Sequence, residues 1–273
     1  MKSRPLRALA SDLDGTLFPI DDSPSHHAAM GELIQLITAH KLRCVFVTGR
    51  SADQTFQGIQ QYSPPEPETI ICDVGTTILH RHADGFEPDA DYHDELHLRL
   101  GDWDHARLLS TALQREPRLW AQPEHQQSDL KTSFYYPAQH RADVQATIHD
   151  WIETQRVPVS MTISVDPFEG LGMLDLLPQG VEKGFALRWW LRHSGLNDGE
   201  VVYAGDTGND ISAINSGVHA ILVGNADAQL RQAAAQHREQ TDPTAGEAPV
   251  LYQAQETATA GVLEGLRMLL GQR

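Results

Sequence analysis

Residues 7–18, RALASDLDGTLF, join a short apolar run to two carboxylates, Asp12 and Asp14. The run has the unbroken apolar character of a strand that is covered on both faces of a parallel sheet. Gly15 and Thr16 follow directly, as in a turn. Two like charges at the end of a buried strand are costly unless a bound cation or a proton offsets one of them. This stretch therefore predicts a strand whose carboxyl end belongs to a binding site.

The chain of 273 residues is acidic, with 37 Asp and Glu against 21 Lys and Arg and a formal net charge of −16. Such a surface repels nucleic acid and anionic membranes, so neither is an expected partner. An anionic substrate would need a cation and local positive groups at its site. No signal peptide or membrane span is visible, and Cys44 and Cys72 lie in apolar runs that fit buried free thiols. We therefore expect a cytoplasmic protein.

Strand-like and helix-like patterns alternate toward both ends of the chain. Further apolar runs that end in small or polar residues occur at 41–50, 68–76, 199–210 and 218–226, and helical patterns occur at 27–41, 181–195 and 257–271. Alternation of this kind predicts an α/β fold built on a doubly wound parallel sheet.

The middle of the chain, from 83 to 178, holds more His, Gln and aromatic residues. Helical patterns occur near 104–115 and 141–155, and alternating strand patterns at 130–137, 158–166 and 172–178. Half-buried antiparallel strands with helices on one side give such alternation. We therefore predict a smaller α+β domain at 83–178, inserted into a discontinuous core that comprises 1–82 and 179–273.

Polar residues gather at the carboxyl ends of the predicted core strands, where open parallel α/β sheets bind their ligands. A lysine also begins the helix that follows the insertion. The residues that folding would bring to this edge are Asp12, Asp14, Thr48, Lys183, Asp206, Asn209 and Asp210. Four carboxylates in one place are unfavourable unless a ligand binds there.

The ligand types at this edge favour a hard cation such as Mg²⁺, because the fourteen histidines show no paired spacing that is typical of a metal site. Mg²⁺ usually completes its coordination with substrate phosphate, and Thr48 and Lys183 could hold other phosphate oxygens. A metal-bound carboxylate can attack phosphorus and form an aspartyl-phosphate, which fits Asp12. Asp14 would then protonate the leaving oxygen and later take a proton from water.

Four segments resemble the motifs of the haloacid dehalogenase superfamily of phosphatases. They are DLDGT (12–16), TGR (48–50), Lys183 at the start of its helix, and GDTGND (205–210). The resemblance implies a Rossmann-like core, dependence on Mg²⁺ and an aspartyl-phosphate intermediate. Because the insertion lies between the second and third motifs, it also resembles the α/β cap of the C2B type.

Carried over residue by residue, the resemblance implies that Asp12 is the nucleophile and Asp14 the acid and base. It implies a phosphate site and a metal site. The phosphate ligands would be Thr48, Gly49, Lys183 and Asn209, and the metal ligands Asp12, Asp14 through its carbonyl, Asp206 and Asp210, the last either directly or through water.

A closer resemblance links the chain to the sucrose-6-phosphate phosphatases. The segments that carry it are ICDVGTTI (71–78), LDLLPQGVEKGFAL (174–187), ILVGNADAQL (221–230) and YQAQETATAGVLEGL (252–266). It implies that sucrose 6-phosphate is the substrate and that the cap segment 126–136 holds the sugar, with Gln127 and Lys131 as candidate contacts. A sugar-phosphate synthase that supplies the substrate is the corresponding partner.

Alternatives remain open at this point. Gly15 and Gln126 depart from the residues that are common in those phosphatases, which leaves mannosylfructose phosphate or a range of hexose phosphates as other substrates. A phosphomutase would use the same chemistry. A phospho-acceptor signalling module would also place acidic residues, Thr and Lys at a sheet edge, but such modules are shorter and lack an inserted cap. The sequence does not determine the oligomeric state.

Overall fold

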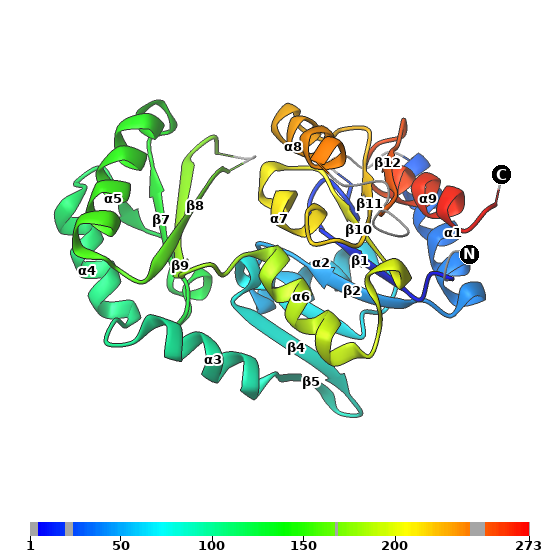
Figure 1. The fold of residues 1–273 in the computed structure, drawn as a ribbon, viewed down its shortest axis with the longest axis horizontal. Coiled ribbons are helices and arrows are strands. Elements are labelled where there is room, and N and C mark those ends of the chain that lie inside the picture. The colour runs from blue at the N-terminus through cyan, green and yellow to red at the C-terminus, as the bar shows by residue number, and fades with distance from the viewer. Residues whose placement is uncertain (1–4, 20–23, 167–168, 241–248, 273) are drawn as a thin grey trace. The chain divides into compact units, whose positions relative to one another are not determined.

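The computed structural model describes residues 5–19, 24–166, 169–240 and 249–272. The chain divides into two compact units (Figure 1). The core unit comprises Met1–Pro88 and Lys183–Arg273, and the cap unit comprises Asp89–Glu182. Each unit has its own sheet.

The core sheet has eight strands in the order β12-β11-β10-β1-β2-β3-β4-β5. Their bounds are β1 (Ala8–Ser11), β2 (Arg43–Val47), β3 (Thr69–Cys72), β4 (Thr77–His82), β5 (Gly85–Pro88), β10 (Val201–Gly205), β11 (His219–Leu222) and β12 (Leu251–Gln253). Neighbours from β12 to β3 are parallel, whereas β4 and β5 are antiparallel additions. The predicted doubly wound α/β core is confirmed, and all five predicted core strands are present.

The helices of the core unit cover both faces of this sheet. They are α1 (Pro24–His40), α2 (Ala52–Tyr62), α6 (Lys183–Ser194), α7 (Ile211–Ile214), α8 (Ala228–Gln240) and α9 (Ala258–Leu269). Leu9 and its neighbours on one face join an apolar cluster with α1 and α9, while α6 and α7 pack on β3 and β10. Every residue of β1 is buried, which explains why its sequence lacks alternation.

The cap unit is an antiparallel sheet with helices, as predicted for an α+β insertion. Its sheet order is β6-β7-β9-β8. The strands are β6 (Trp120–Ala121), β7 (Thr132–Tyr136), β8 (Val159–Val165) and β9 (Gly172–Pro178), and the helices are α3 (Ala90–Leu100), α4 (His105–Arg115) and α5 (Arg141–Gln155). Helices α4 and α5 pack on β7 and β8.

The boundaries of the units differ from the sequence prediction of 83–178. Strand β5 pairs with β4, with His82 opposite Gly85 and Leu79 opposite Pro88, so the chain leaves the core sheet only after Pro88. Strand β5 forms the edge of the sheet and is mostly exposed, so its sequence carries little apolar pattern.

Helix α3 was not predicted, although its sequence carries both end signals. Asp89 is the N-cap and accepts a hydrogen bond from the Tyr92 N–H at 2.9 Å, as capping aspartates do. Gly101 ends the helix with φ +58°, a conformation that favours glycine. Only Tyr92, Leu96 and Leu100 of this helix are buried, so its apolar stripe is narrow.

Two smaller expectations concern membranes and thiols. Within the described ranges, no helix has the length and apolar character needed to cross a bilayer. Cys44 and Cys72 are both buried, and burial raises the pKa of the Cys44 thiol to about 12.

Gly184 allows α6 to approach α7 closely. Its N–H donates to Ser212 Oγ at 3.0 Å, and a Cβ on residue 184 would lie 2.3 Å from the backbone oxygen of Ser212. We predict that Gly184→Ala lowers the free energy of unfolding by about 1–3 kcal/mol, the usual cost of overpacking. Urea unfolding of the two proteins measures this difference.

Gly31→Ala is the matched control, because Gly31 lies within α1 and a Cβ on residue 31 would meet no atom within 4 Å. That change should stabilise the protein by about 0.5–1 kcal/mol. Equal stability of the Gly184→Ala variant and the unchanged protein would show that α6 and α7 do not depend on this close contact.

Candidate active site

The loop after β1 brings Asp12 and Asp206 together. The Asp12 N–H continues the ladder with a 2.9 Å bond to the Ala204 carbonyl, which places residue 12 beside the end of β10. Gly15 turns the chain with φ +74°, and a Cβ there would lie 2.3 Å from Asp206 Oδ2. Thr16 Oγ1 donates to Asp206 Oδ1 at 3.1 Å. A small residue at 15 and a hydroxyl at 16 thus set the position of Asp206.

Three carboxylates and one ammonium form the centre of the site. Oxygens of Asp12, Asp206 and Asp210 lie within 4.8 Å of one another, and all three residues are buried. Lys183 Nζ, at 0% exposure, lies 2.8 Å from Asp12 Oδ1 and 2.7 Å from Asp210 Oδ1. Folding has therefore collected these residues from the ends of β1 and β10 and the start of α6, as the sequence predicted.

The electrostatics of the cluster are unbalanced without a further cation. Burial raises the pKa of Asp12 well above its usual value; Lys183 opposes this shift, and Asp210 and Asp206 add to it. Burial, with repulsion from Asp210, raises the pKa of Asp206 to about 7. Burial lowers the pKa of Lys183, but attraction to Asp12 and Asp210 outweighs burial and leaves it raised, so Lys183 is charged at neutral pH.

This donor set fits a divalent hard cation. Three carboxylates and one ammonium carry a net charge of −2 when ionised, which one divalent ion neutralises. Carboxylate oxygen is the ligand that Mg²⁺ prefers, and a cation between Asp12 and Asp206 would remove the cost of ionising both.

Asp210 differs from the other two carboxylates because its hydrogen-bonding positions are all occupied. Oδ1 accepts from Lys183 at 2.7 Å and from the Tyr203 hydroxyl at 2.6 Å. Oδ2 accepts from the N–H groups of Asp206 and Thr207 at 3.0 and 3.1 Å. A carboxylate offers about four such positions, so Asp210 fixes the lysine and the loop of residues 206–210.

The side chain of Asp14 lies outside this cluster. It is about half exposed and forms a two-point ion pair with Arg50, with Arg50 Nε 2.7 Å from Oδ2. The guanidinium also lies 5.3 Å from the centre of the Phe18 ring. Arg50 is the last residue of TGR (48–50), and its pairing with Asp14 could be found only from the structure.

The remaining phosphate candidates surround the same edge. Thr48 is buried at the end of β2, donates its N–H to the Ile71 carbonyl at 2.8 Å, and accepts at Oγ1 from the Arg50 N–H at 3.2 Å. Gly49 follows it, and a Cβ there would lie 3.9 Å from the nearest side chain, so packing alone does not require glycine. Asn209 Oδ1 lies 3.2 Å from Lys183 Nζ.

Asn225 is a site residue that sequence reasoning missed. Its amide nitrogen donates to the Gly15 carbonyl at 2.8 Å and lies 3.3 Å from Asp206 Oδ2, and its oxygen accepts from the Ala258 N–H at 2.8 Å. Asn225 thereby ties the loop after β1 to β10 and to the start of α9. It follows β11 in the segment ILVGNADAQL (221–230), so its position at a strand end was an available signal.

Comparison with known proteins identifies the family. The family model described as sucrose-6F-phosphate phosphohydrolase matches residues 5–269. The chain belongs to this family. Its members are phosphatases of the haloacid dehalogenase superfamily.

Individual relatives agree with this assignment. A mannosylfructose-phosphate phosphatase of Agrobacterium fabrum is 29% identical over 97% of this chain and 97% of its own length. Sucrose-phosphatase 1 of Nicotiana tabacum is 29% identical over 81% of this chain. The fold is similar to that of a sucrose-phosphatase from Synechocystis, with a TM-score of 0.75, 22% identity, and coverage of 97% of this chain and 98% of that one. The chain spans only 49% of the tobacco enzyme's length, and less than two thirds of the length of most curated relatives that it matches.

The two predicted sugar contacts, Gln127 and Lys131, both lie in the cap unit. Gln127 donates to the Gln122 and Ser133 carbonyls at 3.0 and 2.7 Å and accepts from the Ser133 N–H at 2.7 Å. Its amide thus holds the backbone beside β7. Lys131 is buried, and residues 128 and 131 form a short backbone bridge. A role of either residue in sugar binding stays a prediction.

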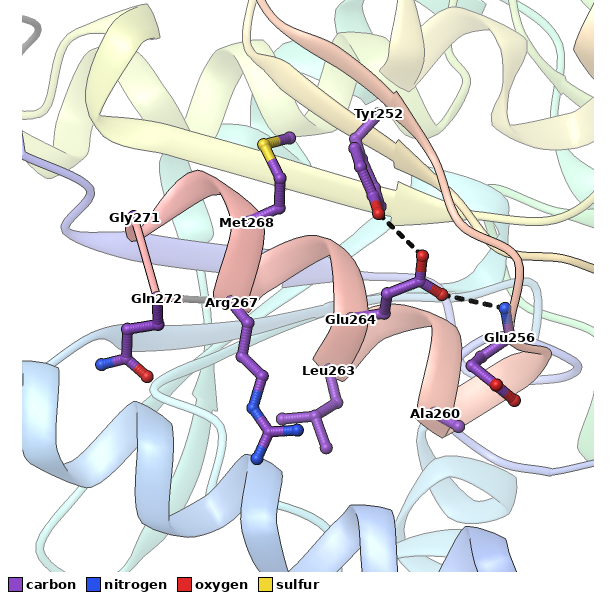
Figure 2. A pocket seen from close by; sticks show the side chains of 9 residues that line it. All are labelled: Tyr252, Glu256, Ala260, Leu263, Glu264, Arg267, Met268, Gly271 and Gln272. Carbon is purple, nitrogen blue, oxygen red and sulfur yellow. Dashed lines mark hydrogen bonds between the residues drawn. The ribbon is translucent and has the colours of Figure 1, made fainter.

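A groove elsewhere in the core unit carries none of the motif residues. It runs along α9 and β12 (Figure 2), with Tyr252, Met268 and Arg267 among its lining residues. Within it, Glu264 accepts from the Tyr252 hydroxyl at 2.7 Å and from the Glu256 N–H at 2.9 Å. The groove lacks the convergent carboxylates and lysine of the strand-end site, so we assign the chemistry to the latter.

Lys183→Met tests the central ion cluster. The substitution keeps the apolar stem but leaves the buried carboxylates of Asp12 and Asp210 without their cation. Loss of one partner of a buried ion pair costs about 3–5 kcal/mol, and we expect a fall of that size in the free energy of unfolding of the metal-free protein at neutral pH. Chemical denaturation gives the value.

Lys41→Met, at an exposed position, is the matched control and should change stability by no more than about 0.5 kcal/mol. If both variants were equally stable, Lys183 would not be the counterion that the geometry indicates.

Proposed function

We propose that this protein is a Mg²⁺-dependent phosphatase that hydrolyses a disaccharide phosphate, with sucrose 6-phosphate as the leading substrate. The observation that carries the chemistry is the buried cluster in which Lys183 contacts Asp12 while Asp206 lies close by. Family membership supports the reaction type. Stability alone does not explain such a cluster, because well-packed hydrophobic residues often stabilise a buried position as well or better.

In this mechanism Asp12 is the nucleophile. Lys183 holds Oδ1, so the carboxylate is fixed by one oxygen while the other attacks phosphorus. The new bond joins Asp12 to phosphorus as the bond between phosphorus and the sugar oxygen breaks, and the sugar leaves with a proton. Water then attacks the aspartyl-phosphate, phosphate departs, and the Asp12 carboxylate is restored.

Mg²⁺, held by Asp12, Asp206 and the Asp14 carbonyl, would supply positive charge beside the phosphoryl oxygens. Asp210 is proposed to act through its bonds to Lys183 and to the loop, because its oxygens are already occupied. Thr48, Gly49 and Asn209 are proposed to contact phosphate from the neighbouring strand ends, where their groups supplement the lysine.

Asp14 is proposed to give a proton to the departing sugar oxygen and to take one from the attacking water. Its carboxyl group is engaged by Arg50 in this structure. The proposed role therefore requires the ion pair to open when substrate binds. The partial exposure of Asp14 leaves room for that movement.

Asp12→Asn tests the nucleophile. The amide cannot attack phosphorus, so we expect phosphate release to fall by about 10³-fold or more, with the circular dichroism spectrum unchanged. Asp84→Asn, at an exposed position of the β4–β5 hairpin, is the matched control and should keep full activity. Full activity in the Asp12→Asn variant would end the proposal.

A substrate panel tests the sugar. Sucrose 6-phosphate, mannosylfructose phosphate and hexose phosphates should be compared by their kcat/KM values, each with Mg²⁺ and with EDTA. We expect sucrose 6-phosphate to give the highest value and EDTA to abolish turnover of all of them. A higher value for mannosylfructose phosphate, which the full-length similarity to the Agrobacterium phosphatase makes the second candidate, would reassign the substrate.

Comparable values across the panel would indicate a broad hexose-phosphate phosphatase, and phosphate transfer to a second sugar would indicate a phosphomutase.

The cellular setting is also a proposal. A chain with only two cysteines, both buried, suits a reducing cytoplasm. A sugar-phosphate synthase that supplies the substrate is the proposed partner in the reaction sequence.

A further inference from the structure

A second cluster of ligand-type side chains lies within the cap unit, and its Asp129 belongs to the cap segment 126–136 described above. His93 and His97 come from α3, and Asp129 precedes β7. The two histidines are four residues apart on a helix, so they project from the same face. The expectation that no histidines have ligand spacing was therefore wrong, and it failed because helix α3 was not predicted.

The three donor atoms form a compact triangle. Asp129 Oδ2 lies 2.9 Å from His93 Nε2 and 3.1 Å from His97 Nε2, and the two Nε2 atoms are 3.2 Å apart. Ligands at 2.0–2.1 Å from a tetrahedral zinc ion are separated by about 3.3 Å. The triangle thus already has nearly the dimensions of three corners of such a site.

At most two hydrogens can serve the three contacts of this triangle, because each Nε2 carries at most one and an ionised carboxylate carries none. Hydrogen bonding therefore leaves at least one of the three contacts without a hydrogen between its atoms. A metal ion can accept a lone pair from each of the three atoms.

The backbone on both sides holds the cluster in place. Helix α3 is capped by Asp89 and anchored by buried Leu96. The segment with Asp129 is closed by the backbone bridge in which the Ser128 N–H donates to the Lys131 carbonyl at 3.0 Å. The imidazoles of His93 and His97 are each 45% exposed, so an ion and a coordinating water can enter from solvent.

We propose that His93, His97 and Asp129 bind a divalent transition-metal ion, with zinc as the representative ion and water as the fourth ligand. Two imidazoles and one carboxylate suit zinc and its neighbours rather than Mg²⁺, which prefers oxygen. The ion would cross-link α3 to the segment that leads into β7. This site shares no residue with the carboxylate cluster of the core unit.

Calorimetric titration of the full chain with Zn²⁺ tests the proposal. The experiment is run with Mg²⁺ in large excess, and it is repeated with Asp206→Asn to remove zinc binding at the core cluster. We expect one zinc ion bound in both cases. His93→Ala, His97→Ala and Asp129→Asn should each weaken that binding by about 100-fold or more, since loss of even an outer partner of a metal ligand costs 10–100-fold.

His149→Ala is the matched control, because His149 is an exposed histidine of α5 in the same unit and should leave the affinity unchanged. A thermal scan supplies a second readout: Zn²⁺ should raise the Tm of the unchanged protein and of His149→Ala, but not that of the three cluster variants. If zinc binding and the Tm shift were the same in all these proteins, the cluster would be a hydrogen-bonded group only, and the proposal would be wrong.

Discussion

The buried ammonium of Lys183 is the group on which the core site depends. It lies within hydrogen-bond distance of Asp12 and Asp210 and is fully removed from solvent. Burial of an isolated charge is strongly unfavourable, and the two carboxylates compensate for it only at these short distances. The ends of β1 and β10 and the start of α6 must therefore meet in one arrangement.

The surrounding contacts follow from that requirement. Gly184 lets α6 approach α7 closely, and this approach brings Lys183, the first residue of α6, to the cluster. Asp210 accepts hydrogen bonds from the Tyr203 hydroxyl and from the backbone N–H groups of Asp206 and Thr207. These bonds fix its carboxylate beside Lys183. The excess negative charge that remains lies on Asp12 and Asp206, where burial, together with repulsion from neighbouring carboxylates, raises both pKa values. A divalent cation would offset this excess negative charge.

The cap unit shows the same dependence of side-chain chemistry on backbone placement. Gln127 is a predicted sugar contact, and its amide makes three hydrogen bonds to the backbone around β7. His93 and His97 carried no signal as isolated letters, but helix α3 turns them into a pair that faces Asp129. In the cap unit, the hydrogen-bond partners of a side chain are needed to tell whether it holds the fold together or is available to a ligand.

The sequence by itself determined the doubly wound core, the inserted α+β unit and the set of residues at the carboxyl ends of β1, β2 and β10. It could do so because apolar runs report burial on both faces, and because parallel strands bring their ends to one edge. It did not determine the β4–β5 hairpin or α3, whose limited burial leaves a weak pattern. Only the tertiary structure decided that Arg50 pairs with Asp14, that Asn225 braces the Gly15 loop, and that Asp210 is fully occupied. These are contacts between side chains whose directions depend on packing, and separation along the chain carries no information about them.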